Sequence, residues 1–169
     1  HPRIAFRGEM DTLQALLLLA QKEAAQQGQS KIARHLGECL DYSRKMLSAD
    51  VLEEPLPERK LGEMTPAELR AHSHNPQKYY GQPHFMPDVS DGQTVLLLNR
   101  CRCAVRQGEL AAARAFIDSD GVCHRGDILK ALNRMSSMVY ILMIQQMKIS
   151  TFILFREKIQ YAIMIRRII

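Results

Sequence analysis

Four long stretches of this chain carry apolar residues at every third or fourth position, which is the spacing that gathers side chains on one face of an α-helix. These stretches predict helices over residues 9–27, from the residue after Ser30 to beyond Leu47, over 92–117 and over 126–147. Their apolar residues are mainly Leu, Ala, Met and Ile, which favour helices over strands. The pattern therefore argues against an all-β fold.

Short turns are expected between the first and second predicted helices and between the third and fourth. Gly28 is a stop signal for the first helix, Ser30 is expected to cap the second, and residues 118–121 (DSDG) form a turn before the last. The 169 residues fit a single domain. Long amphipathic helices joined by short connections predict an all-α fold, an antiparallel helical bundle. The third of these helices is expected to turn the following residues inward: Thr94, Leu98, Cys101, Val105, Gly108 and Ala112.

Residues 53–92 interrupt this pattern because they hold six of the seven prolines. Proline is incompatible with a helix interior, so only a short helix near residues 65–71 is expected, with Thr65 as its N-cap and Pro66 at its first position. A long irregular segment inside a compact domain is more often functional than accidental. We expect this segment to form part of the site.

The C-terminal segment, residues 148–169, differs in charge from the rest of the chain. It carries five basic residues and one acidic residue, whereas the whole chain has a formal net charge of +5. The remainder is thus nearly neutral, which does not favour nucleic-acid binding. We expect an amphipathic helix that packs on the bundle or on a neighbouring subunit. A helix lying at a membrane surface is the alternative, and a membrane-spanning helix is not expected.

The four cysteines show no CxxC spacing, so neither a disulfide framework nor a thiolate zinc site is expected. With no signal peptide pattern, reduced thiols and a cytoplasmic location are predicted. His72, His74 and His84 could in principle bind zinc or cobalt through imidazole nitrogens. Three histidines in a polar loop are more often solvated or capping groups, so no metal site is predicted among them.

Arg102, Arg106 and Glu109 project from one face of the helix predicted over residues 92–117. Two guanidiniums one turn apart can bind a polyphosphate, and a carboxylate on the next turn can orient one of them or a metal-bound water. The alternative is an ordinary exposed ladder of salt bridges, which spacing alone does not exclude.

Two further polar residues stand beside apolar stripes. Asp11 lies in the first turn of the first predicted helix, where it either interacts with the helix dipole or pairs with an arginine of another helix. Asn133 lies in the middle of the last predicted helix, although asparagine is a poor helix former. It either contacts a ligand or forms an interior hydrogen bond.

Three of these segments resemble motifs of the PduO-type ATP:cob(I)alamin adenosyltransferases, and most closely their ethanolamine-utilisation branch. Residues 1–13, HPRIAFRGEMDTL, are similar to the family pattern D-P-R-[IV]-x-x-x-G-x-x-D-E-L. Residues 102–109, RCAVRQGE, resemble R-x-x-x-R-x-x-E, and residues 127–137, DILKALNRMSS, resemble a helix with L-N-R-L-S. The motifs occur in the family's order, over about residues 1–146.

The resemblance implies a trimer of antiparallel five-helix bundles, ferritin-like and up-down, with sites between subunits that bind ATP and cobalamin. In that family Co(I) of the reduced corrinoid attacks the 5′ carbon of ATP, which yields adenosylcobalamin. It also implies a role in ethanolamine catabolism, a reductase that supplies electrons, and association with a bacterial microcompartment as a second possible location. The expected domains are residues 1–147, the transferase bundle, and 148–169, the tail.

The resemblance also implies roles for individual residues. Arg106 would bind the polyphosphate, and Arg102 would pair with Asp11 across the site. Asn133 would contact ATP, and Glu109 would orient Arg106 or a Mg²⁺ ion. Phe85 and Met86, in the proline-rich segment, would cover the corrinoid.

The chain departs from the family pattern in three places. The Thr- and Gly-rich phosphate-binding segment and the cysteine-rich stretch of the ethanolamine branch are not in this sequence, and Thr12 replaces the usual Glu. A helical corrinoid-binding or trimeric scaffold without catalytic activity is therefore the alternative function.

Overall fold

The computed structural model describes the backbone of residues 1–84 and 86–168, and the side chains of residues 1–84 and 86–147. Over this part of the chain every regular element is a helix, apart from isolated bridges between Leu61 and Met64 and between Ile117 and Cys123. The all-α prediction is confirmed. The six helices are α1 (Pro2–Gln26), α2 (Ser30–Val51), α3 (Pro66–His74), α4 (Pro76–Tyr80), α5 (Gln93–Phe116) and α6 (Gly126–Ile168).

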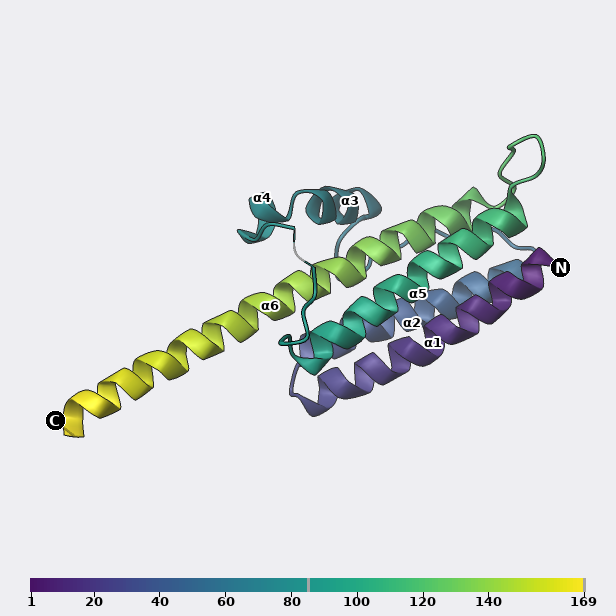
Figure 1. The fold of residues 1–169 in the computed structure, drawn as a ribbon. Coiled ribbons are helices and arrows are strands. Elements are labelled where there is room, and N and C mark those ends of the chain that lie inside the picture. Colours follow the sequence, from purple (N-terminus) through teal and green to yellow (C-terminus); the bar gives the residue numbers. More distant parts are fainter. Residues whose placement is uncertain (85, 169) are drawn as a thin grey trace.

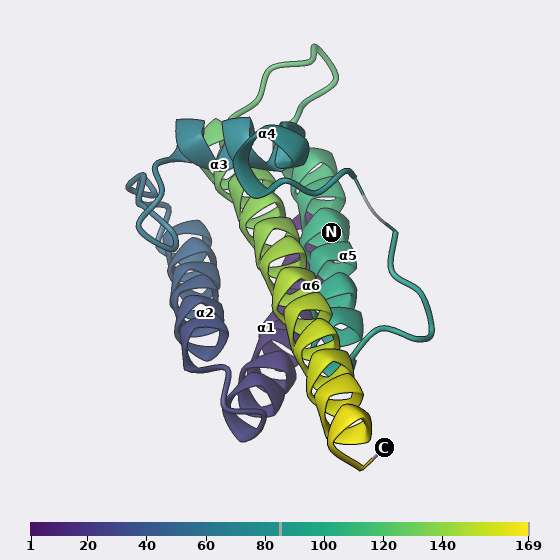
Figure 2. The same ribbon diagram turned by 90° about the vertical axis from the view of Figure 1, so that its left-hand side faces the viewer.

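The four long helices lie side by side, with α1 packed between α2 and α5, and α5 packed between α1 and α6 (Figure 1). The short helices α3 and α4 lie against α6 (Figure 2). The core is formed by one apolar stripe from each long helix. All six residues predicted to point inward from α5 are buried, and the stripe of α1 consists of Phe6, Met10, Leu13, Leu17, Ala20 and Ala24.

Two predicted helix starts are wrong. Helix α1 begins at Pro2 rather than near Glu9, because Pro2 is compatible with a first turn and the His1 side chain accepts a hydrogen bond from the Arg3 N–H. Ser30 is not a cap: it is the first residue of α2, and Gln29 precedes it without a side-chain cap. The stop signal at Gly28 is confirmed, since its φ of 70° favours glycine and ends α1.

The proline-rich segment contains more helix than the sequence predicted. Thr65 caps α3 in a capping box with Glu68, as expected for Thr65-Pro66, but the helix extends to His74. Helix α4 was not predicted; Pro76 occupies its first turn, so the same proline signal could have located it. The Ser73 hydroxyl donates to the Ser137 hydroxyl across 3.0 Å and ties α3 to α6.

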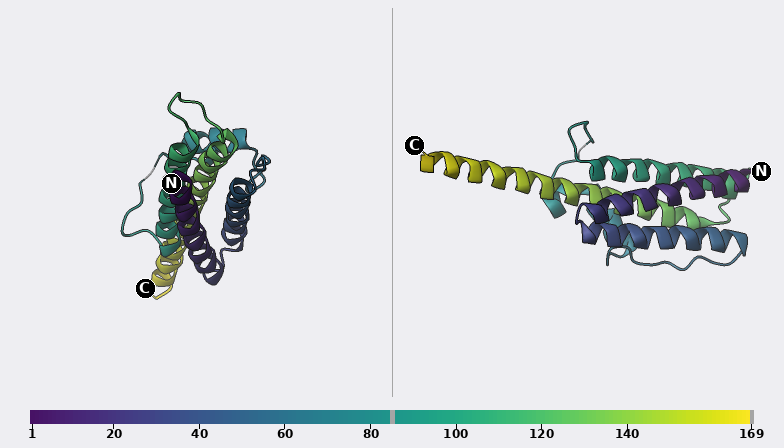
Figure 3. Two further views of the ribbon diagram at one scale, coloured as in Figure 1. Left: turned by 90° about the vertical axis from the view of Figure 1, so that its right-hand side faces the viewer. Right: turned by 90° about the horizontal axis from the view of Figure 1, so that it is seen from below.

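Helix α6 continues without a break through the expected boundary at residue 147 and extends past the ends of the other long helices (Figure 3). Predictions about the side chains of residues 148–169, including their amphipathic packing, lie outside the described residues. Within the described residues, none of the helices is both long and apolar enough to span a bilayer.

A buried carboxylate joins α1 to α2. The side chain of Asp50 is fully buried, and its two oxygens accept hydrogen bonds from Arg3 Nε at 3.0 Å and from Arg7 Nε at 2.8 Å. Arg3 also donates through Nη2 to the backbone oxygen of Asp50 at 2.8 Å. Sequence analysis missed Asp50, because only the partner helix reveals that its charge is compensated.

Replacing Asp50 by Asn should lower the free energy of unfolding by about 1–3 kcal/mol, because two guanidiniums then face a neutral amide. Arg3 and Arg7 are each about one-third exposed and can regain water, which limits the loss. The matched control is Asp41→Asn, which removes an exposed pair with Arg44 at 3.8 Å and should cost less than about 0.5 kcal/mol. Urea unfolding of both variants measures the difference, and equal losses would contradict this interpretation.

The cysteines should differ in reactivity. Cys39 and Cys101 are buried, and burial raises the pKa of the Cys101 thiol to about 12 and that of Cys39 higher still. Because the thiolate is the reactive form, iodoacetamide at pH 8 should leave both unmodified in the folded protein and alkylate exposed Cys123. Peptide mass spectrometry with and without urea checks this; modification of Cys39 without denaturant would contradict the packing.

Candidate active site

The seam between α5 and α6 holds two adjoining pockets. The first, of about 310 Å³, is lined by Arg102 and Arg106 from α5 and by Asn133 and Tyr140 from α6. His84, from the segment after α4, lies at its edge. The second, of about 530 Å³, shares Arg106 and Asn133 with the first and adds Glu109. The structure therefore brings four of the predicted site residues into one cleft.

The helical repeat explains why these four residues lie in the same cleft. The buried stripe of α5 uses Cys101, Val105 and Gly108, so the positions next to it in the helical repeat face the seam. On α6 the buried stripe includes Leu132 and Met135, which leaves Asn133 at the rim. Apolar packing of the two helices thus places the polar residues opposite one another.

Arg102 is half-buried and lies over the ring of Tyr140, with Cζ 5.4 Å from the ring centroid. His84 stacks on the same ring and forms a 3.1 Å hydrogen bond between its Nδ1 and the Tyr140 hydroxyl. A cation over an aromatic face is stabilised by the ring quadrupole. The contact with Tyr140 therefore holds the guanidinium of Arg102 in the cleft.

Asn133 links two charged groups. Its Nδ2 donates to Glu109 Oε1 across 2.8 Å, and its Oδ1 accepts from Arg134 Nη1 across 3.0 Å. The carboxylate of Glu109 thus contacts the asparagine amide rather than Arg106, which differs from the orientation expected for Glu109. Because both ends of the amide are used, its orientation is determined by the two charges.

Arg106 is exposed and lines both pockets. Within the described residues no carboxylate pairs with its guanidinium, so the charge remains available for an anion in the cleft. Asp11 is exposed on α1, and the described part of this single chain contains no ion pair between it and Arg102. That pair stays a prediction about neighbouring chains.

A family model described as cobalamin adenosyltransferase matches residues 1–146, a span that includes the whole cleft. The chain belongs to the cobalamin adenosyltransferase family. It is 37% identical over 146 residues to the corrinoid adenosyltransferase EutT of Salmonella typhimurium, and equally to EutT of Escherichia coli K12. Each match covers 85% of this chain and 52% of the relative, so the chain spans about half the length of these proteins. No solved structure was found to match.

The segment expected to cover the corrinoid in this family is only partly described. Phe85 lies outside the described residues. Met86 is 90% exposed and Val89 is 91% exposed, so the described part of the chain buries neither side chain. Burial of such side chains is favourable, which is consistent with a ligand or a neighbouring chain covering them.

His72 and His74 lie in α3 and His84 lies in the segment after α4, and the ring nitrogens of the three histidines contact different groups. His72 Nδ1 contacts the Tyr80 hydroxyl at 2.9 Å, His74 Nδ1 contacts the Arg70 carbonyl at 2.9 Å, and His84 contacts Tyr140. In the described residues no three His, Cys, Asp or Glu side chains are grouped so that they could hold a metal ion.

Sequence analysis of this family member missed Tyr140 and Ser137 as site residues. Both are on the same face of α6 as Asn133, with Ser137 four and Tyr140 seven positions further along, so helical spacing could have identified them once Asn133 was chosen. The role of His84 had no local signal, since its contact with Tyr140 joins residues 56 positions apart.

Asn133→Asp should destabilise the protein in a pH-dependent way. Two adjacent carboxylates oppose each other's ionisation, so their pKa values in the folded state rise above those in the unfolded state. Stability is then lost as the pH rises through the folded-state pKa values. We expect a loss of about 0.5–1 kcal/mol at pH 7 and a much smaller loss at pH 3.5, because the seam is partly exposed.

Urea unfolding at both pH values measures this effect. Gln93→Glu is the matched control, because it adds a carboxylate at an exposed position of α5 that lines neither pocket and is sixteen residues from Glu109. A loss from Asn133→Asp that is the same at both pH values would show that Asn133 and Glu109 do not interact.

Proposed function

We propose that this protein is an ATP:corrinoid adenosyltransferase that transfers the 5′-deoxyadenosyl group of ATP to Co(I) of cobalamin. Cobalt attacks the 5′ carbon, the bond between that carbon and its oxygen breaks, and triphosphate leaves. Family membership supports this reaction. The observation that carries it for this chain is the cleft in which Arg106, without a carboxylate partner among the described residues, stands one turn from Arg102.

The leaving triphosphate defines what the cleft must do. Negative charge accumulates on the departing oxygen, so a fixed cation nearby stabilises the transition state more than the ground state. Arg106 supplies this charge, and its planar guanidinium can hold two phosphate oxygens at once. Its exposure in the single chain leaves room for the polyphosphate.

Arg102 acts as a positioning residue in this proposal. Tyr140 holds its guanidinium from one side. Asp11 of a neighbouring protomer would pair with it from the other, which requires the trimer that the resemblance implies. Asp11 is exposed and forms no ion pair with the described residues, which is compatible with such a contact.

Asn133 would contact ATP, and Glu109 would serve a Mg²⁺ ion bound to the phosphates. Mg²⁺ prefers oxygen ligands and is usually held by one or two carboxylates together with phosphate oxygens, so the carboxylate of Glu109 fits such a role. When bound, the ion would neutralise phosphate charge. Asn133 holds Glu109 in place through the 2.8 Å hydrogen bond.

The corrinoid would bind against the segment that carries Phe85 and Met86. An apolar wall there disfavours a lower axial ligand on cobalt and makes Co(II) easier to reduce. The exposed Met86 and Val89 side chains support this assignment, because a large apolar ligand would bury them.

The wider setting follows from the relatives. We propose an antiparallel five-helix bundle, composed of α1, α2, α5, α6 and the α3 helix that packs on α6, and its assembly into a trimer. Residues 1–147 would form the transferase domain and 148–169 a separate tail. The EutT relatives support a role in ethanolamine utilisation. A reductase partner and a location in the cytoplasm or with a microcompartment are proposed only because the family resemblance implies them.

Arg106→Ala should lower kcat about 10²–10³-fold, the usual cost of removing one donor that stabilises transition-state charge. Arg106→Lys should recover only part of the loss, since an ammonium cannot hold two oxygens in one plane. An anaerobic absorbance assay of cobalt–carbon bond formation from ATP and reduced cobalamin measures both.

The matched control is Arg100→Ala, which removes an exposed arginine of α5 outside the cleft and should change kcat less than about twofold. An unchanged rate in Arg106→Ala would refute the assignment of Arg106. A folded protein with no turnover at all would favour the non-catalytic scaffold.

A further inference from the structure

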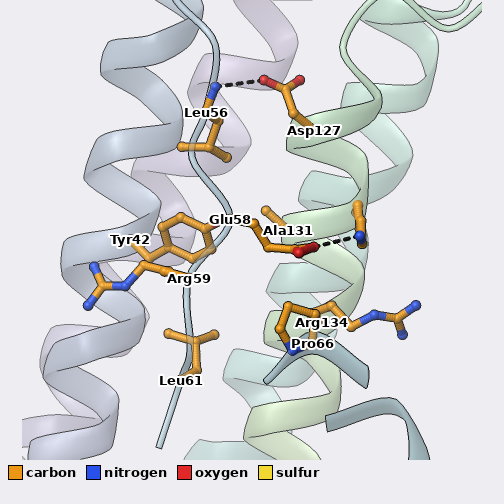
Figure 4. A pocket seen from close by; sticks show the side chains of 10 residues that line it. Tyr42, Leu56, Glu58, Arg59, Leu61, Pro66, Asp127, Ala131 and Arg134 are labelled. Carbon is orange, nitrogen blue, oxygen red and sulfur yellow. Dashed lines mark hydrogen bonds and ion pairs between the residues drawn. The ribbon is translucent and has the colours of Figure 1, made fainter. Parts of the chain in front are cut away.

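A pocket separate from the two in the cleft lies on another face of α6, between α2 and the segment that precedes α3. It has a volume of about 230 Å³, and its residues on α6 are Lys130, Ala131 and Arg134, whereas Asn133 and Tyr140 face the cleft. Figure 4 shows Tyr42 of α2 on one wall and Ala131 and Arg134 on the other. No role in the proposed reaction uses this pocket.

Buried side chains form an apolar part of the pocket wall. The side chains of Tyr42, Leu56, Leu61 and Ala131 are each less than 8% exposed and contribute to its walls. The Tyr42 hydroxyl donates to the Pro57 carbonyl at 3.1 Å, which fixes the position of the ring in the wall. Such walls favour an aromatic ring over a chain of polar groups.

The charged groups at the rim leave a positive surplus. Glu58 pairs with Lys130, and Asp127 pairs with Arg125 at 3.0 Å while accepting from the Leu56 N–H at 2.8 Å. Arg59 and Arg134 also line the pocket, and within the described residues neither guanidinium has a carboxylate partner. Their guanidiniums lie at opposite edges (Figure 4).

Arg59 is the cation nearest to the aromatic wall, with Cζ 5.4 Å from the centroid of the Tyr42 ring. Burial raises the pKa of the Tyr42 hydroxyl, so this group stays neutral at pH 7 and does not repel an anion. An anionic group on an aromatic ligand in this pocket would therefore meet Arg59 without facing an unpaired carboxylate.

We propose that this pocket binds a small aromatic acid, with its ring against Tyr42 and its anionic group on Arg59. The stem of Arg134 forms part of the wall, and the same side chain donates to Asn133 Oδ1 at 3.0 Å. A bound ring restricts the rotamers of Arg134 and so favours the orientation in which Asn133 holds Glu109. Occupancy of the pocket then strengthens ATP binding in the cleft, a consequence that rests on the proposed function.

Benzoate is the probe, and its binding to the full chain is measured by ligand-observed NMR. For a ligand of this size we expect a Kd of about 0.1–1 mM. Acetate, which lacks the ring, and benzylammonium, which reverses the charge, should bind at least tenfold more weakly. No detectable benzoate binding at 10 mM (on the order of ten times the weakest expected Kd), or equal binding of benzylammonium, would overturn the proposal.

Two variants locate the site. Arg59→Gln should weaken benzoate binding about fivefold or more. The matched control is Arg44→Gln, which removes an exposed arginine of α2 that does not line the pocket and should leave binding unchanged. Ala131→Leu fills the pocket and should abolish binding; circular dichroism verifies that it remains folded. Unchanged binding in a folded Ala131→Leu or in Arg59→Gln would refute this location.

The coupling is tested separately. Saturating benzoate should lower the KM for ATP about twofold or more in the adenosylation assay, and this effect should disappear in Arg59→Gln. An unchanged KM in an active protein would refute the coupling. If the protein shows no adenosylation, the proposed function fails while the benzoate titration still decides whether the pocket binds aromatic acids.

Discussion

Helix α5 is packed on two sides, by α1 and by α6, and this burial determines which of its residues remain for chemistry. The small or apolar residues Cys101, Val105 and Gly108 lie in the core, so the rotation of the helix is fixed by the free energy of apolar burial. Arg102 and Arg106 then face the seam with α6. The cleft is thus a consequence of core packing rather than of any local motif.

The arginines of this protein have two different electrostatic environments. Arg3 and Arg7 compensate the buried carboxylate of Asp50, where an unpaired charge would be costly, and they join α1 to α2. Arg106, by contrast, lies at the surface of the cleft with no carboxylate partner among the described side chains. Because Arg106 is exposed, its unpaired charge costs little free energy of folding and is available to bind an anion.

Much of the site could be predicted from sequence because its residues obey helical spacing. Arg102, Arg106 and Glu109 share a face of one helix whatever else the chain does. The partner of Glu109 could not be predicted, because Asn133 is 24 positions away and reaches it only after α5 and α6 pack. The missed contact of His84 with Tyr140 has the same cause.

The sequence by itself determined the helices and their inward faces, since periodicity and capping act over a few residues. Thr65 with Pro66 and the turn at Gly28 are local signals of this kind. Only the tertiary structure decided that Asp50 is buried, that α3 and α4 lie on α6, and that one face of α6 lines the cleft while another lines the pocket beside Tyr42. These outcomes depend on contacts between residues far apart in the chain. The free energy of such contacts cannot be predicted from local sequence patterns.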